Sequence, residues 1–102
     1  MIAEKIQSVP HGFIKTFLDN LEAEFKRSEG FTWGELVEIG AYGSDLDHDD
    51  VLEINKQATK EDYEKVDFFE PSDSAYPYAV ASHVLERLAN DLGQKKGYLT
   101  RP

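Results

Sequence analysis

Two amphipathic helix patterns, one toward each end of the chain, restrict the possible folds most strongly. Apolar residues recur at i, i+4 and i+8 in the first pattern, and at i, i+3, i+4, i+7 and i+11 in the second. The first pattern consists of Phe13, Ile14, Phe17, Leu18, Leu21 and Phe25, and the second of Ala81, Val84, Leu85, Leu88 and Leu92. Because neither apolar stripe can remain in water, we expect the first and last helices to pack together.

Helix-start signals between these two patterns predict further helices. Thr32 and Glu35 have the spacing of a capping box, in which two side chains satisfy free backbone N–H groups. Residues 44–47 and Thr59 provide two more N-cap signals, and the helix after Thr59 is expected to place Tyr63 and Val66 inside. The sequence therefore predicts an all-α bundle of four to five helices.

An α+β fold is the alternative, because residues 51–55 and 66–69 contain β-branched and aromatic residues that suit short strands. At 102 residues the chain is expected to form a single acidic domain over 1–102. Gly93 follows the last apolar pattern, so we expect the last helix to end there and residues 93–102 to form a flexible C-terminal tail.

The acidic residues are concentrated in the middle of the chain. The net charge is −9, whereas residues 29–73 alone hold 14 acidic and three basic residues, which gives −11 and leaves +2 for the rest. A field of this sign repels nucleic-acid phosphates and anionic membranes and attracts basic proteins. We therefore expect no direct binding to nucleic acid or membrane, and a basic protein partner such as a nuclease or a nucleic-acid-binding protein.

Residue patterns for catalysis or metal binding are missing from the sequence. There is no cysteine, and no two of the three histidines have the i, i+4 spacing that would place both on one helix face. If Asp45 were the first residue of an EF-hand calcium loop, Asp50 would stand where the loop needs glycine, and Lys56 would stand where it needs its final glutamate. We expect no enzymatic activity, no cofactor and no tight metal site.

No apolar run approaches the roughly 20 residues needed to cross a bilayer, and no basic start followed by an apolar stretch marks a signal peptide. We therefore expect a cytoplasmic protein. We also expect it to be monomeric when it is not bound to a partner.

The candidate binding residues are carboxylates of residues 45–64 together with one tyrosine. Clustered carboxylates speed the encounter with a basic partner, whereas affinity comes from a few buried anchors, among which tyrosine is common. Tyr42 is the aromatic residue nearest the acidic cluster along the chain. The predicted contact surface consists of Tyr42, Asp45, Asp47, Asp49, Asp50 and Glu53, extended by Glu61 and Glu64.

In composition the chain resembles the immunity proteins of colicin DNases, which are acidic helical inhibitors of basic nucleases. Short segments carry the resemblance: Glu-Leu-Val at 35–37, Gly-Ser-Asp-Leu at 43–46, and the end rich in glycine and lysine. The family's Tyr-Tyr-Pro is replaced by Asp-His-Asp at 47–49. The resemblance implies a stoichiometric inhibitor that blocks a nucleic-acid-handling partner by charge mimicry. The alternative is an accessory or structural interaction domain, such as a phage or plasmid assembly component, whose acidity serves only solubility.

Overall fold

The computed structural model describes residues 12–68, 70 and 72–100, and this part of the chain is helical without any strand. The elements are α1 (Phe13–Arg27), α2 (Trp33–Gly43), α3 (His48–Asn55), α4 (Lys60–Glu64), α5 (Tyr76–Lys96) and the 3-10 turn η2 (Tyr98–Thr100). The predicted all-α bundle is confirmed. Residues 51–55 are helical and 66–68 form a turn, so the strands of the α+β alternative are absent there, and Phe69 lies outside the described residues.

Capping boxes start three of the helices. In each box the N-cap side chain accepts from the backbone N–H three residues later, and that residue's carboxylate accepts from the N-cap N–H. The pairs are Thr32 with Glu35, Asp47 with Asp50, and Thr59 with Asp62. The predicted caps at Thr32 and Thr59 are therefore confirmed, and the start expected within 44–47 lies at Asp47.

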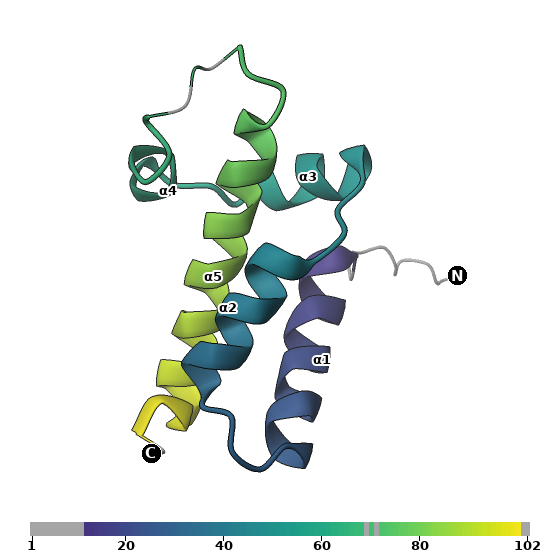
Figure 1. The fold of residues 1–102 in the computed structure, drawn as a ribbon, viewed down its shortest axis with the longest axis vertical. Coiled ribbons are helices and arrows are strands. Elements are labelled where there is room, and N and C mark those ends of the chain that lie inside the picture. The colour runs from purple at the N-terminus through teal and green to yellow at the C-terminus, as the bar shows by residue number, and fades with distance from the viewer. Residues whose placement is uncertain (1–11, 69, 71, 101–102) are drawn as a thin grey trace, which may run out of the picture.

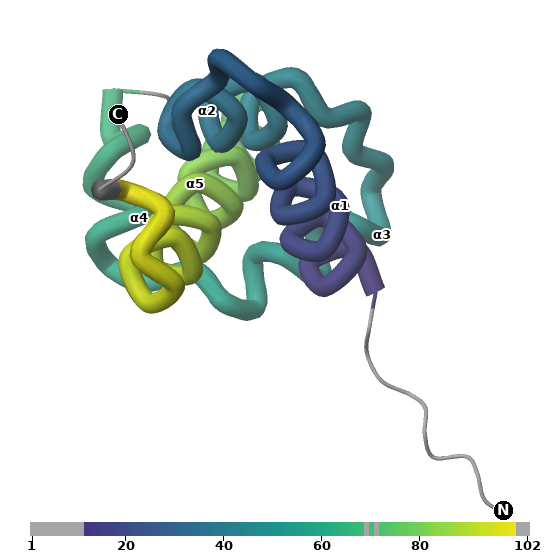
Figure 2. The backbone as a smooth tube through the Cα atoms, turned by 90° about the horizontal axis from the view of Figure 1, so that it is seen from below, coloured from purple at the N-terminus to yellow at the C-terminus, as the bar shows by residue number. Residues whose placement is uncertain are grey.

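Helix α5 is the central element and contacts α2, α3 and α4, and α2 lies beside both α5 and α1 (Figures 1 and 2). Helix α1 runs back along α2, while α3 and α4 pack on opposite sides of α5 (Figures 1 and 2). The predicted packing of the first helix on the last is only partly right, because α2 makes the main contacts with both. Between α1 and α5 lies a groove of about 840 Å³ whose apolar lining comes from Ile14, Leu18, Leu88 and Leu92.

The hydrophobic core receives side chains from α1, α2, α3 and α5 and from the turn after α4. Its buried members among the described residues are Phe17, Leu21, Phe25, Trp33, Leu36, Val37, Ala41, Val51, Ile54, Val66, Val80, Ala81, Val84, Leu85 and Ala89. The two apolar stripes that the sequence predicted therefore contribute to one common core.

Trp33 joins the start of α2 to the end of α5. Its indole Nε1 donates a buried hydrogen bond to the carbonyl oxygen of Ala89 at 2.9 Å. Its ring centroid lies 5.4 Å from that of Phe25, edge to face, and 4.9 Å from that of Tyr98. Edge-to-face and tilted aromatic pairs of this kind add to the stabilisation that burial provides.

Gly93 provides the space that the Trp33 indole occupies. A Cβ atom at this position would lie less than 3.0 Å from Trp33 Nε1. The predicted helix end at Gly93 is wrong, because α5 continues to Lys96 and ends at Gly97, whose φ of 80° is in the left-handed region that favours glycine. Residues 93–96 are thus helical and Tyr98 packs on the core, so residues 93–100 do not form a tail, and residues 101–102 lie outside the described residues.

A Gly93→Ala substitution should destabilise the protein, although alanine normally favours a helix by about 1 kcal/mol over glycine. The new methyl group must displace the Trp33 indole, and overpacking of this kind costs about 1–3 kcal/mol. Gly34→Ala in α2 is the matched control, since its Cβ would meet nothing closer than 4.0 Å and should leave stability unchanged or raised. Urea denaturation followed by circular dichroism measures both, and equal effects would contradict this packing.

Candidate binding surface

The first turn of α3 and the connection before it carry four aspartates in six residues. Asp45, Asp47 and Asp49 are exposed and Asp50 is half-buried. The Asp50 N–H donates to Asp47 Oδ1 at 2.9 Å, and the Asp47 N–H donates to Asp50 Oδ2 at 3.4 Å. Asp47 and Asp50 therefore have a structural role as the helix cap. Asp45 and Asp49 have no such role within the described part of the chain.

Within the described structure, almost all the carboxylates of residues 29–73 lack a basic partner. Among the residues that the structure describes, Asp62 is the only one of these 14 acids that forms an ion pair with lysine or arginine. The other such ion pairs involve acids outside this segment. The negative field of the segment is therefore not neutralised within the described structure.

The structure divides the predicted contact residues into two groups. Residues 45–53 lie at α3, whereas Glu61 and Glu64 lie on α4. Figures 1 and 2 both show α3 and α4 on opposite sides of α5. Glu61 and Glu64 are exposed but do not extend the α3 surface, so the acidic segment does not form one contiguous face.

Glu53 is used inside the fold. Its Oε1 atom accepts a hydrogen bond from the backbone N–H of Phe13, the first residue of α1, at 3.3 Å. The N-cap residue of α1 is Gly12, which has no side chain to satisfy this group. A carboxylate from α3 therefore caps α1, where the helix dipole also favours negative charge.

Tyr42 is held at the boundary between α2 and α5. Its hydroxyl donates to Glu86 Oε1 at 2.7 Å and lies 3.0 Å from His83 Nδ1. Partial burial and the neighbouring Glu86 carboxylate raise the pKa of Tyr42 above its ordinary value. The side chain remains partly exposed, and these two contacts fix its hydroxyl.

The exposed face of α2 ends at Tyr42, three residues before Asp45. Glu35, Glu38, Ile39 and Tyr42 are exposed and follow the i, i+3, i+4, i+7 spacing of one helix face. Ile39 is 59% exposed, although it is a large apolar residue. Ile39 was not among the predicted contact residues. Its position outside the buried apolar stripe of α2 was the sign in the sequence that it would be exposed.

A groove of about 520 Å³ lies between α1 and α2, and we call it the α1–α2 groove. Apolar side chains form most of its lining, and within the described part of the chain its two charged residues are both acidic. The lining residues are Phe13, Thr16, Phe17, Asn20, Leu21, Glu24, Phe31, Leu36, Ile39, Gly40, Ser44 and Asp45. Asp45 thus belongs both to the acidic connection before α3 and to an apolar groove.

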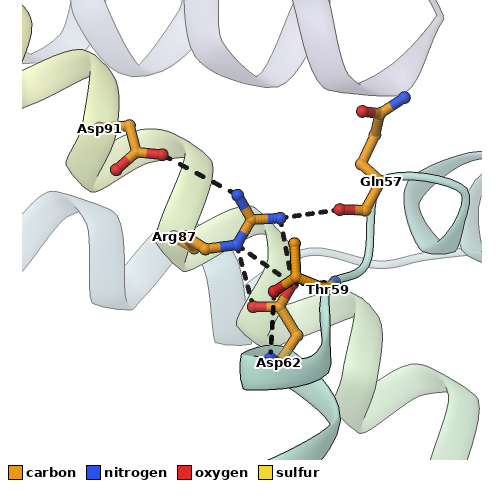
Figure 3. A network of polar contacts seen from close by, with 5 residues as sticks. All are labelled: Gln57, Thr59, Asp62, Arg87 and Asp91. Atoms are coloured by element: carbon orange, nitrogen blue, oxygen red, sulfur yellow. Dashed lines mark hydrogen bonds and ion pairs between the residues drawn. The ribbon is translucent and has the colours of Figure 1, made fainter.

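A polar network that the sequence analysis missed fixes α4 to α5 (Figure 3). The Arg87 Nε atom donates to both carboxylate oxygens of Asp62 at 3.1 Å, and its Nη2 donates to the Gln57 carbonyl oxygen at 2.8 Å. Arg87 Nη1 also lies 3.9 Å from the Asp91 carboxylate. Burial alone would raise the pKa of Asp62, but hydrogen bonds from Arg87 and Thr59 lower it below its ordinary value.

The predicted inner face of α4 is only partly right. Asp62 is 0% exposed, whereas Tyr63, which was expected inside, is exposed, and the expectation for Val66 is confirmed. The N-cap signal at Thr59 gave no sign that Asp62 is buried or that it pairs with Arg87, which lies 25 residues later in the chain. All members of this network lie in α4, α5 and the segment before α4, so we interpret it as a structural clamp between α4 and α5.

Among the described residues, no group of three or more histidine, aspartate or glutamate side chains is arranged to hold a metal ion. Within the same part of the chain, no helix combines the length and apolar character that a membrane span needs. No family model matches the chain, and neither a curated protein nor a solved structure matches it.

Proposed function

We propose that this is a non-enzymatic acidic binding protein that inhibits a basic, nucleic-acid-handling protein by presenting carboxylates where its partner binds phosphates. The observation that carries the proposal is the set of exposed carboxylates that have no basic partner within the described structure. We use the name α2–α3 acidic surface for the exposed residues of α2, of the connection after it and of the first turn of α3, namely Glu35, Glu38, Tyr42, Asp45, Asp47 and Asp49.

Charge and anchor have different roles on this surface. Exposed carboxylates attract a basic partner over a distance and raise the association rate, but each contributes little affinity because water and salt screen it. Affinity comes from a side chain that is desolvated on binding. Tyr42 suits this role because its contacts with Glu86 and His83 hold it in place, so little conformational entropy is lost on binding.

The experiment is affinity capture from the native host with three baits: the wild type, Asp45→Asn/Asp49→Asn and Glu61→Gln/Glu64→Gln. Both variants remove two negative charges, and none of the four side chains takes part in a capping box. We expect a basic protein to be retained by the wild type and the α4 variant and lost from the α3 variant. One equivalent of wild type should also block that protein's nucleic-acid binding or cleavage.

Two results would count against the proposal. Equal retention by all three baits would make the acidity a solubilising device, as in an accessory interaction domain. A captured partner whose activity is unchanged by an equivalent of the wild type would remove the inhibitory role.

A further inference from the structure

Two large apolar side chains that line the α1–α2 groove are exposed to solvent. These are Ile39 and Phe31, which are 59% and 48% exposed. A single exposed apolar residue is normal, but two that border a concave apolar lining form a patch of the kind that marks binding sites. The volume of about 520 Å³ falls within the range of about 300–1,000 Å³ typical of ligand sites.

The charges around the groove indicate the chemistry of its occupant. Among the residues that the structure describes, the charged lining residues are Glu24 and Asp45, and none of the lining residues is a lysine or arginine. Glu24 pairs with Arg27 on α1, whereas Asp45 has no basic partner in the described structure and continues into the α2–α3 acidic surface. A second copy of the chain would bring a net charge of −9 against these same acids and would be repelled. The field favours a cationic occupant with apolar side chains.

The shape of the groove suits a helix. Helices α1 and α2 run side by side, and a groove between two helices is a common seat for the apolar face of a third. Helix α2 has 11 residues, a length of about 16 Å, which exceeds the roughly 10 Å between the first and last anchors of an i, i+3, i+7 pattern. Two turns of helix therefore fit along it.

We propose that the α1–α2 groove receives the apolar face of a basic amphipathic helix of the partner protein, with the helix's lysines or arginines against Asp45 and the α2–α3 acidic surface. This inference rests on the proposed function and adds the partner's contact element. Ile39 and Phe31 are the apolar anchors on this side, and Asp45 connects the apolar and charged parts of the contact.

The test uses three synthetic peptides of about 14 residues and measures their Kd by isothermal titration calorimetry. The first contains leucine and lysine with the leucines on one helix face, the second has the same composition in scrambled order, and the third has glutamate in place of lysine. We expect the first peptide to bind at least about tenfold more tightly than the other two, because only it matches both the apolar lining and the charge.

Variants then locate the contact. Ile39→Ser should weaken binding of the first peptide by about tenfold or more, and Asp45→Asn/Asp49→Asn should weaken it mainly at low salt. Leu99→Ser is the matched control, since Leu99 is 48% exposed and does not line the groove, and it should bind as the wild type does.

The outcomes separate this inference from the proposed function. If Ile39→Ser binds the first peptide like the wild type while Asp45→Asn/Asp49→Asn weakens it, the groove is not the contact and the acidic surface stands. If the glutamate peptide binds as tightly as the lysine peptide, both the basic occupant and the charge argument fail. Concentration-dependent dimers of the wild type that Ile39→Ser abolishes would assign the groove to a second copy and overturn the inference.

Discussion

Replacing Arg87 with methionine is expected to lower the free energy of unfolding by about 3–5 kcal/mol. The change keeps a long apolar side chain but leaves the fully buried Asp62 carboxylate without its cation. It also removes the bond that Arg87 donates to the Gln57 carbonyl oxygen. Urea denaturation followed by circular dichroism at neutral pH measures the loss.

An exposed ion pair provides the control for this prediction. Arg27 pairs with Glu24 at the end of α1, where both side chains are largely exposed, so Arg27→Met should change stability by less than about 1 kcal/mol. If Arg27→Met and Arg87→Met lowered the free energy of unfolding by similar amounts, the structural clamp formed by Arg87 and Asp62 would be refuted.

The stability gap between wild type and Arg87→Met should depend on pH. Because Arg87 holds the pKa of Asp62 below its unfolded value of about 3.9, the pair stabilises the fold fully above that value and progressively less as the pH falls through it. The gap should therefore narrow from about pH 5 downward. A gap that stays constant over this range would show that Asp62 ionisation is not responsible for it.

Truncation of Trp33 to alanine is expected to lower the free energy of unfolding by about 3–5 kcal/mol. It removes the aromatic contacts with Phe25 and Tyr98, leaves a cavity between the start of α2 and the end of α5, and deletes the hydrogen bond to Ala89. Phe31→Ala is the comparison, because that ring is about half exposed and should cost less than about 1.5 kcal/mol.

The Trp33 contact with Gly93 can be isolated by a double-mutant cycle. Gly93→Ala should be unfavourable in the wild type and neutral or favourable in Trp33→Ala, because the methyl group then enters the space left by the indole. Additive effects of the two substitutions would contradict the close approach.

The sequence predicted those parts of the fold that depend on neighbouring residues. Apolar spacing identified α1 and α5, and the caps at Thr32 and Thr59 depend on residues three positions away. The end of α5 was misplaced because a glycine after an apolar run is the usual sign of a helix end. At Gly93 the glycine is required by Trp33, which lies 60 residues earlier in the chain, and no local pattern reveals that contact.

The candidate surface was less predictable, because its extent depends on tertiary placement. Closeness along the chain suggested that Glu61 and Glu64 would extend the aspartates of α3, but α5 separates the two groups. Glu53 is half-buried and caps α1, which no spacing in its own helix indicates. Tyr42 and Asp45 remain predicted contact residues, and the fold adds Ile39, which lines the same groove as Asp45.

The most direct test of the proposed function is the salt dependence of the association rate constant between the captured partner and the wild type, Asp45→Asn/Asp49→Asn or Glu61→Gln/Glu64→Gln. We expect the wild-type rate constant to fall steeply between about 0.05 and 0.5 M salt, because screening shortens the reach of the carboxylates. Asp45→Asn/Asp49→Asn should be slower at low salt and less salt-dependent, while Glu61→Gln/Glu64→Gln stays close to the wild type. Identical salt dependence for all three proteins would contradict the assignment of the contact to the α2–α3 acidic surface.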